Sequence, residues 1–271
     1  ATGLPWDMLL LGRALKPVID RALPETRYID NIPVKPDSPQ EDEIALANMS
    51  PLSFYHGIYF PRAFDHHLRR GLFFEGCTEG EIAEWQETFT YFLSKLWLQQ
   101  GQKRLLIKNP VYTSRVAMLH ELYPDALFIH IQRNPYEVFE SMRNFYAKLF
   151  KQLALQPYGH VDIDEVVLSV YERIMGLIDA EWPTIPASQR VDVAYADLDR
   201  APIAELERIY TSLGLPGFDT VRPRFEAYLN SVSDFKKNRF DYSDKSAALV
   251  EARLGAYLER GHYARPGSDA A

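Results

Sequence analysis

Cysteine is nearly absent from this sequence, which has one, Cys77, in 271 residues. A single cysteine excludes an intrachain disulfide. It fits a reducing compartment, and because we find no signal peptide, we expect a cytoplasmic protein. Long apolar runs are also missing: none approaches the roughly 18 residues that a membrane helix needs, so we expect no membrane span.

An excess of basic residues is lacking as well, since the formal net charge is -7. A general nucleic-acid-binding protein would usually be basic, so we expect no nucleic-acid partner. A local basic site for an anionic ligand remains open.

Motifs for metal ions and for nucleotide kinases are missing too. No spacing of cysteine, histidine and acidic residues fits a metal site, so we expect no metal. His66 and His67 are adjacent and would not normally chelate one ion together, which indicates a surface position. His130 alternates with apolar residues and is expected in the core. The G-x-x-x-x-G-K-[ST] loop does not occur, which argues against a nucleotide kinase.

The apolar segments that are present alternate with amphipathic ones. With 46% hydrophobic residues, the chain can bury a sizeable core, which fits one large domain or two small ones. Of these we expect one domain over 1–271. The strands are predicted at 103–108, 126–132 and 190–195. The helices are predicted at 6–23, 41–49, 77–101, 113–123, 135–154, 163–181, 202–214 and 250–263, with the rest of 24–62 mostly loop. This alternation predicts an α/β fold, a parallel sheet with helices on both faces.

The clearest helix is 77–101. Thr78 and Glu81 have the spacing of a capping box, and Gly101 is placed to end the helix. One face is apolar, formed by Trp85, Phe89, Phe92, Leu93 and Leu96.

Three residues stand where predicted strands end: Lys108, Arg133 and Tyr195. Ligands of such folds lie beyond the carboxyl ends of the strands, so these positions are candidates for binding. Arg133 is followed by Asn134, a good N-cap, and Pro135 at the first helical position. The helix would direct its positive end at the strand tip, and Arg133 with Ser141 would form an anion site. The alternative is an arginine paired with a loop carboxylate, and spacing alone does not decide.

The segment "DSPQEDEIALANMS" (37–50) gathers carboxylates at a helix start. Glu41 or Glu43 could take a proton from a substrate hydroxyl. The commoner explanation is that such carboxylates complement the helix dipole. Lys108 could neutralise charge on a transferred group, although a solvated lysine is the simpler interpretation.

Two loops provide further candidates. The basic segment "DFKKNRF" (234–240) is either solvated or a lid over phosphate. His56 lies in the aromatic-rich "FYHGIYF" and is a weak candidate for substrate contact.

Several segments, in this order, resemble the sulfotransferase family, in particular its bacterial-type branch of small-molecule and carbohydrate enzymes. They are "DSPQEDEIALANMSPLSFYHGIYFPR", "LLIKNP", "YPDALFIHIQRNPYEVFESM", "VAYADLDRAPIAELERIYTSLGL" and "FKKNRF". The resemblance covers nearly the whole chain and implies a P-loop-NTPase-like parallel sheet.

The resemblance also implies a donor, 3′-phosphoadenosine-5′-phosphosulfate, and an acceptor hydroxyl or amine on a small molecule or carbohydrate. Arg133 and Ser141 have the spacing at which the family holds the donor's 3′-phosphate. Tyr195 in "YADL" corresponds to the tyrosine that contacts the adenine. The residues expected to close over the nucleotide are Lys236, Lys237, Asn238 and Arg239.

The sequence departs from the family in two places. Some relatives carry a catalytic histidine soon after the "LIK" segment, where Tyr112 stands here, which shifts the role of base to Glu41 or Glu43. The strand, Gly/Ser/Thr-rich phosphosulfate loop and helix with which the family begins do not occur. We therefore expect a chain truncated at its amino end that is inactive by itself. The alternative is a non-catalytic nucleotide-binding or scaffold protein derived from such an enzyme.

Overall fold

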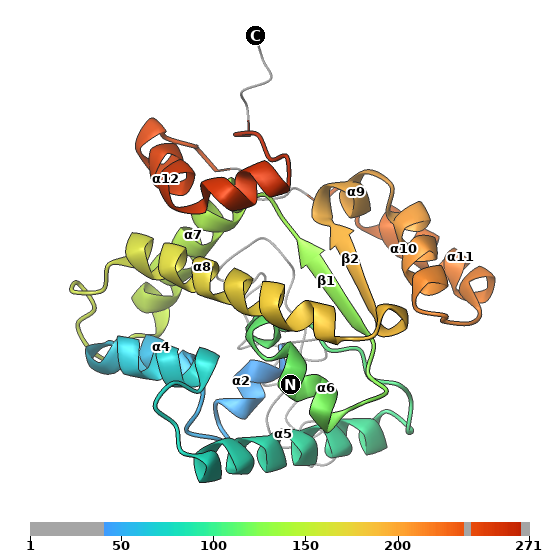
Figure 1. The fold of residues 1–271 in the computed structure, drawn as a ribbon, viewed down its shortest axis with the longest axis horizontal. Helices are drawn as coiled ribbons and strands as arrows, with labels where there is room; N and C mark the ends of the chain where they lie inside the picture. Colours follow the sequence, from blue (N-terminus) through green and yellow to red (C-terminus); the bar gives the residue numbers. More distant parts are fainter. Residues whose placement is uncertain (1–40, 236–239, 267–271) are drawn as a thin grey trace, which may run out of the picture. The chain divides into compact units, whose positions relative to one another are not determined.

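The computed structural model of the chain describes residues 41–235 and 240–266 (Figure 1). The chain divides into two compact units. The first unit is Ala1–Val111 with Phe145–Ile163, and the second unit is Tyr112–Asn144 with Asp164–Ala271. The expectation of one domain over 1–271 stays a prediction. The predicted helix 6–23 lies outside the described residues.

The first unit is helical in its described part. It contains α2 (Asp42–Leu46), α3 (Tyr55–Tyr59), η2 (Pro61–Ala63), α4 (Phe64–Phe73), α5 (Glu79–Gln99) and the second half of α7 (Pro135–Leu153). The capping box of Thr78 and Glu81 is present at the start of α5. Trp85, Phe89 and Phe92 are buried, which confirms the predicted helix and its apolar face.

Helix α3 was missed, because 24–62 outside 41–49 was expected to be mostly loop. Its aromatic and small residues are poor helix formers, but packing against α4 outweighs this weak preference. Gly71 of α4 makes that packing possible. A Cβ there would lie 2.2 Å from the backbone nitrogen of Phe54, so only glycine lets α4 approach this stretch.

The predicted strand 103–108 is wrong. The segment has no regular secondary structure, and Leu106 is 90% exposed. Its apolar pattern fits a strand, but a strand needs a hydrogen-bonded neighbour. Within the described residues, none pairs with it. Lys108 therefore does not end a strand.

The second unit contains the sheet. After η3 (Pro110–Ser114), at the boundary along the chain, its elements are α6 (Val116–Leu122), β1 (Phe128–Gln132), the start of α7, α8 (Ile163–Glu181), η4 (Trp182–Thr184), η5 (Ala187–Gln189), β2 (Arg190–Ala194), α9 (Tyr195–Arg200), α10 (Pro202–Ser212), α11 (Phe218–Ser231) and α12 (Asp244–Arg260). In the described residues, β1 and β2 form a two-stranded parallel sheet. Figure 1 shows them side by side, with α9 and α10 next to β2.

Helices cover both faces of this sheet. On one face, Val191 and Val193 of β2 pack against Ile209 and Leu213 of the α10 region. On the other face, Phe128 of β1 packs against a cluster from α6, α8, η4 and the residue after η4, which comprises Val116, Ile178, Trp182 and Ile185. The predicted α/β class with a parallel sheet between helices is confirmed.

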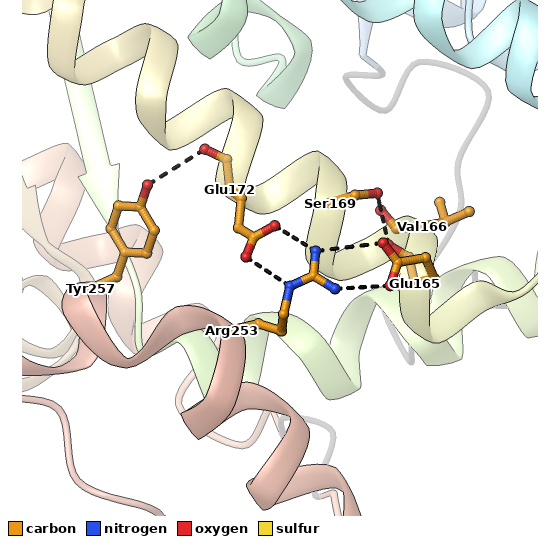
Figure 2. A network of polar contacts seen from close by, with 6 residues as sticks. All are labelled: Glu165, Val166, Ser169, Glu172, Arg253 and Tyr257. Atoms are coloured by element: carbon orange, nitrogen blue, oxygen red, sulfur yellow. Dashed lines mark hydrogen bonds and ion pairs between the residues drawn. The ribbon is translucent and has the colours of Figure 1, made fainter.

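Helix α12 is fixed on α8 by ion pairs (Figure 2). The guanidinium of Arg253 donates to Glu172 at 2.6 and 2.9 Å and to Glu165 at 2.9 Å. Seven residues further along both helices, Arg260 donates to Asp179 at 2.8 Å. The acidic residues stand seven apart on α8 and the arginines seven apart on α12, so each set lies along one side of its helix.

Candidate functional site

Arg133 directly follows β1 and Tyr195 directly follows β2. The central carbon of the Arg133 guanidinium lies 4.5 Å from the centroid of the Tyr195 ring. The parallel pairing explains this closeness, because Gln132 and Ala194, the preceding residues, are partners in the register. The structure thus brings together two residues 62 positions apart that the sequence placed at strand ends.

The start of α7 faces the same strand tip. The side-chain oxygen of Asn134 accepts a hydrogen bond from the Tyr136 amide at 3.1 Å, as expected of an N-cap. Its side-chain nitrogen donates to the Ala264 carbonyl at 2.8 Å. Asn134 therefore both starts α7 and holds the segment that follows α12.

Glu137 is the partner of Arg133 here. The Arg133 Nε donates to a Glu137 oxygen at 2.7 Å, and the two side chains are 37% and 30% exposed. The carboxylate belongs to α7, not to a loop. Ser141 is half-buried one turn beyond Glu137, on the same side of α7. Glu137 and Ser141 therefore lie on the side of α7 at which Arg133 is paired.

The charges of Glu137 and Arg133 act on Tyr242. Its pKa is raised above the ordinary value, first by burial and then by the charge of Glu137, while the charge of Arg133 acts against the rise. The residues just before α12 are thus close to the candidate anion site. Lys236, Lys237, Asn238 and Arg239, of the basic segment, lie outside the described residues.

A polar cluster on the sheet was missed by the sequence analysis. One Asp192 oxygen accepts hydrogen bonds from His130 Nδ1 at 3.0 Å and Gln132 Nε2 at 3.1 Å, and the other accepts from Trp182 Nε1 at 2.9 Å. Burial would raise the pKa of Asp192, but the bonds from His130, Trp182 and Gln132 and the His130 charge hold it below its ordinary value. A carboxylate inside the apolar strand "RVDVA" was the signal that could have found it.

In the first unit, Glu41 and Lys108 form an ion pair although they stand 67 residues apart. The Lys108 side chain is 73% exposed and that of Glu41 is 26% exposed. The structure thus joins two residues that the sequence proposed for catalysis on separate grounds.

Glu43 lies next to this pair in the chain but is fully buried. One of its oxygens accepts a hydrogen bond from the Ser53 hydroxyl at 2.7 Å, and the other accepts from Asn109 at 3.5 Å. The same Asn109 nitrogen donates to Asp42 at 3.0 Å. Because a general base needs to be within hydrogen-bond reach of the proton that it takes, directly or through one water, the burial of Glu43 favours Glu41 as the candidate.

His56 is held by backbone carbonyls through both ring nitrogens. Nδ1 lies 3.1 Å from the Pro51 oxygen and Nε2 lies 2.8 Å from the Ala47 oxygen. Both ring nitrogens are therefore directed at backbone carbonyls, and a neutral imidazole donates a hydrogen bond to one of them. The geometry favours a structural role for His56 at the end of α2.

No group of three or more histidine, cysteine or acidic residues in the described part of the chain could hold a metal ion. None of the helices in residues 41–235 and 240–266 has the length and apolar character needed to cross a membrane.

Comparison with protein families matches residues 59–220 to the model described as the sulfotransferase family. This segment is more than half of the chain. The chain belongs to the sulfotransferase family. The matched segment contains Lys108, Arg133, Ser141 and Tyr195, whereas Glu41, Glu43 and His56 precede it and the basic loop follows it.

Two curated relatives are described as omega-hydroxy-beta-dihydromenaquinone-9 sulfotransferase Stf3, from Mycobacterium bovis and Mycobacterium tuberculosis. Each is 28% identical to this chain over 256 residues, which is 94% of this chain and 66% of the relative. The chain therefore spans slightly less than two thirds of the length of these relatives.

Two solved structures share the fold. Sulfotransferase STF9 from Mycobacterium avium superposes with a TM-score of 0.65 at 17% identity, covering 93% of this chain and 63% of that one. Sulfotransferase STF1 from Mycobacterium tuberculosis gives 0.63 at 18% identity, covering 92% and 64%. At these identities the comparison supports the fold alone.

Proposed function

We propose that this protein transfers a sulfuryl group from 3′-phosphoadenosine-5′-phosphosulfate to an acceptor hydroxyl. The observation that carries the proposal is the pair of Arg133 and Tyr195 at the ends of neighbouring parallel strands, in a chain of the sulfotransferase family. An arginine beside an aromatic ring at a helix start fits a nucleotide that carries an extra phosphate.

The residues of the second unit have binding roles in this proposal. Arg133 and Ser141 hold the 3′-phosphate, and Arg133 exchanges its bond to Glu137 for one to the phosphate. Tyr195 contacts the adenine, and Lys236, Lys237, Asn238 and Arg239 close over the nucleotide.

The chemical step forms one oxygen–sulfur bond and breaks another. The acceptor oxygen attacks the sulfur, and the bond from sulfur to the 5′-phosphate oxygen breaks with its electron pair left on the nucleotide. Glu41 takes the proton of the acceptor hydroxyl, with Glu43 as the alternative base. Lys108 offsets charge that develops on the leaving phosphate, as cations do in phosphoryl transfer.

The acceptor in this proposal is a hydroxyl-bearing small molecule. The curated relatives are named for a hydroxylated menaquinone, and their similarity extends over 94% of this chain. A carbohydrate hydroxyl or an amine is the alternative.

The proposal is tested with donor that carries radioactive sulfur and a panel of hydroxyl acceptors, including hydroxylated quinones, sugars and an amine. We expect label in an acceptor product, dependent on the intact protein. Tight binding of the nucleotide without label transfer to any acceptor would favour the non-catalytic nucleotide-binding alternative.

A further inference from the structure

The Asp192 carboxylate joins the two strands of the described sheet. Asp192 and His130 are direct partners in the parallel register, and the carboxylate also accepts hydrogen bonds from Gln132 and from Trp182 of η4. The His130 side chain is 11% exposed and that of Asp192 is 50% exposed. Three donors thus converge on one carboxylate.

This cluster lies close to the residues proposed to bind the nucleotide. His130 precedes Arg133 by three residues on one strand, and Asp192 precedes Tyr195 by three residues on the other. Because both strands run in the same direction, the register set at His130 and Asp192 also determines which residues meet beyond the strand ends.

A shift of one residue in the register between β1 and β2 would be energetically costly at Asp192. The side chains of a strand alternate between faces, so the shift would turn Asp192 to the face where Val191 and Val193 are buried under α10. The carboxylate would then lose all three donors and lie in an apolar environment.

We infer that Asp192, with His130 as its cross-strand partner, is a positioning residue for the nucleotide site. It holds β1 and β2 in the register that places Arg133 over Tyr195, and it does not touch the nucleotide itself. The inference rests on the proposed function, in which Arg133 binds the 3′-phosphate.

The test measures how strongly the protein prefers 3′-phosphoadenosine-5′-phosphate over adenosine 5′-phosphate, which lacks the 3′-phosphate. Both affinities are obtained by calorimetric titration. A general loss of stability weakens both nucleotides alike and leaves the ratio unchanged. Misplacement of Arg133 weakens only the nucleotide with the 3′-phosphate.

The variants are Asp192→Asn, His130→Leu and His130→Asn. Asp192→Asn removes the carboxylate charge, and His130→Leu removes the Nδ1 donor. Each should reduce the preference for the nucleotide with the 3′-phosphate about tenfold, as expected for a lost charge-assisted contact. His130→Asn places an N–H donor where Nδ1 stands and should keep most of the preference. Asp179→Asn is the matched control, because the Asp179 side chain is about as exposed as that of Asp192 and is also paired within the second unit, with Arg260, but it lies on α8.

Any one of three results would overturn the inference. If the wild-type protein prefers the 3′-phosphate and His130→Leu, folded by circular dichroism, keeps that preference, the inference fails and the proposed function stands. The same applies to a folded Asp192→Asn. If the wild-type protein shows no preference, the proposed donor site fails and the inference fails with it.

Discussion

Arg133 and Tyr195 stand 62 residues apart in the chain, yet the guanidinium of one lies 4.5 Å from the ring centroid of the other. Neither residue belongs to a strand, and each follows one. The parallel register therefore creates the candidate nucleotide site, and the following predictions depend on this arrangement.

Replacing Arg133 should weaken binding of 3′-phosphoadenosine-5′-phosphate. A lost charge-assisted contact costs about 1.5–3 kcal/mol, so Arg133→Ala should reduce affinity about tenfold or more in calorimetric titration. Arg200→Ala is the control, because Arg200 is 78% exposed and pairs with Asp197 on α9. Equal affinities of the wild type and Arg133→Ala would remove Arg133 from the proposed site.

Replacing Glu137 should have the opposite effect. Its carboxylate holds Arg133 at 2.7 Å and would repel a phosphate, so Glu137→Gln should bind the nucleotide about two- to fivefold more tightly, the size of a partly exposed ion pair. Glu226→Gln is a matched control, because Glu226 and Arg222 form a pair of the same spacing on α11. Weaker binding by Glu137→Gln would show that the carboxylate supports Arg133 in the bound state.

Glu41 and Glu43 should respond differently to replacement by glutamine in an active enzyme. Removal of a positioned base slows turnover about 100- to 10,000-fold, and we expect this of Glu41→Gln with an unchanged melting temperature. Glu43 is buried and accepts from Ser53 and Asn109, so Glu43→Gln should mainly lower stability, by about 1–3 kcal/mol. Near-normal turnover in both folded variants would place the base elsewhere.

Tyr136 should make stability depend on alkaline pH. Burial, the hydrogen bond at 2.9 Å to Glu251 and the charge of that carboxylate raise the pKa of Tyr136 from 10.0 to about 12. The folded state therefore keeps the phenol proton where an unfolded tyrosine loses it. The stabilisation is fully present below pH 10 and is lost as the pH rises to about 12.

The measurement compares the melting temperatures of the wild type and Tyr136→Phe from pH 8 to pH 12. Burial also raises the pKa of Tyr146 and Tyr171, so only the difference between the two proteins reports Tyr136. The difference should shrink above pH 10. A constant difference over the whole range would contradict the shift.

The sequence predicted the helices and strands whose signals are local. The capping box of Thr78 and Glu81 and the apolar face of α5 are examples, since both depend on residues within a few turns. The segment 103–108 shows the limit, because its apolar residues suit a strand but pairing depends on a distant neighbour. Helix α3 was missed for a related reason, since it depends on a close approach at Gly71 of α4.

In the candidate site, too, the local features could be predicted and the contacts between distant residues could not. Arg133 and Tyr195 could be placed at strand ends from the sequence. Their contact and the ion pair of Glu41 with Lys108 could not be predicted, because each depends on packing between distant segments. The pairing of Arg133 with Glu137 is local, since the two residues stand four apart. The cluster at Asp192 also depends on the register of two strands, which no single segment encodes.

The most direct test compares turnover with two donors, 3′-phosphoadenosine-5′-phosphosulfate and adenosine 5′-phosphosulfate, which lacks the 3′-phosphate. Transfer of radioactive sulfur to an acceptor is measured for the intact wild-type protein and for Arg133→Ala. We predict that the wild type uses the donor with the 3′-phosphate at least about tenfold more efficiently and that Arg133→Ala loses this preference. Equal use of both donors by the wild type, or an unchanged preference in Arg133→Ala, would contradict the proposed donor site.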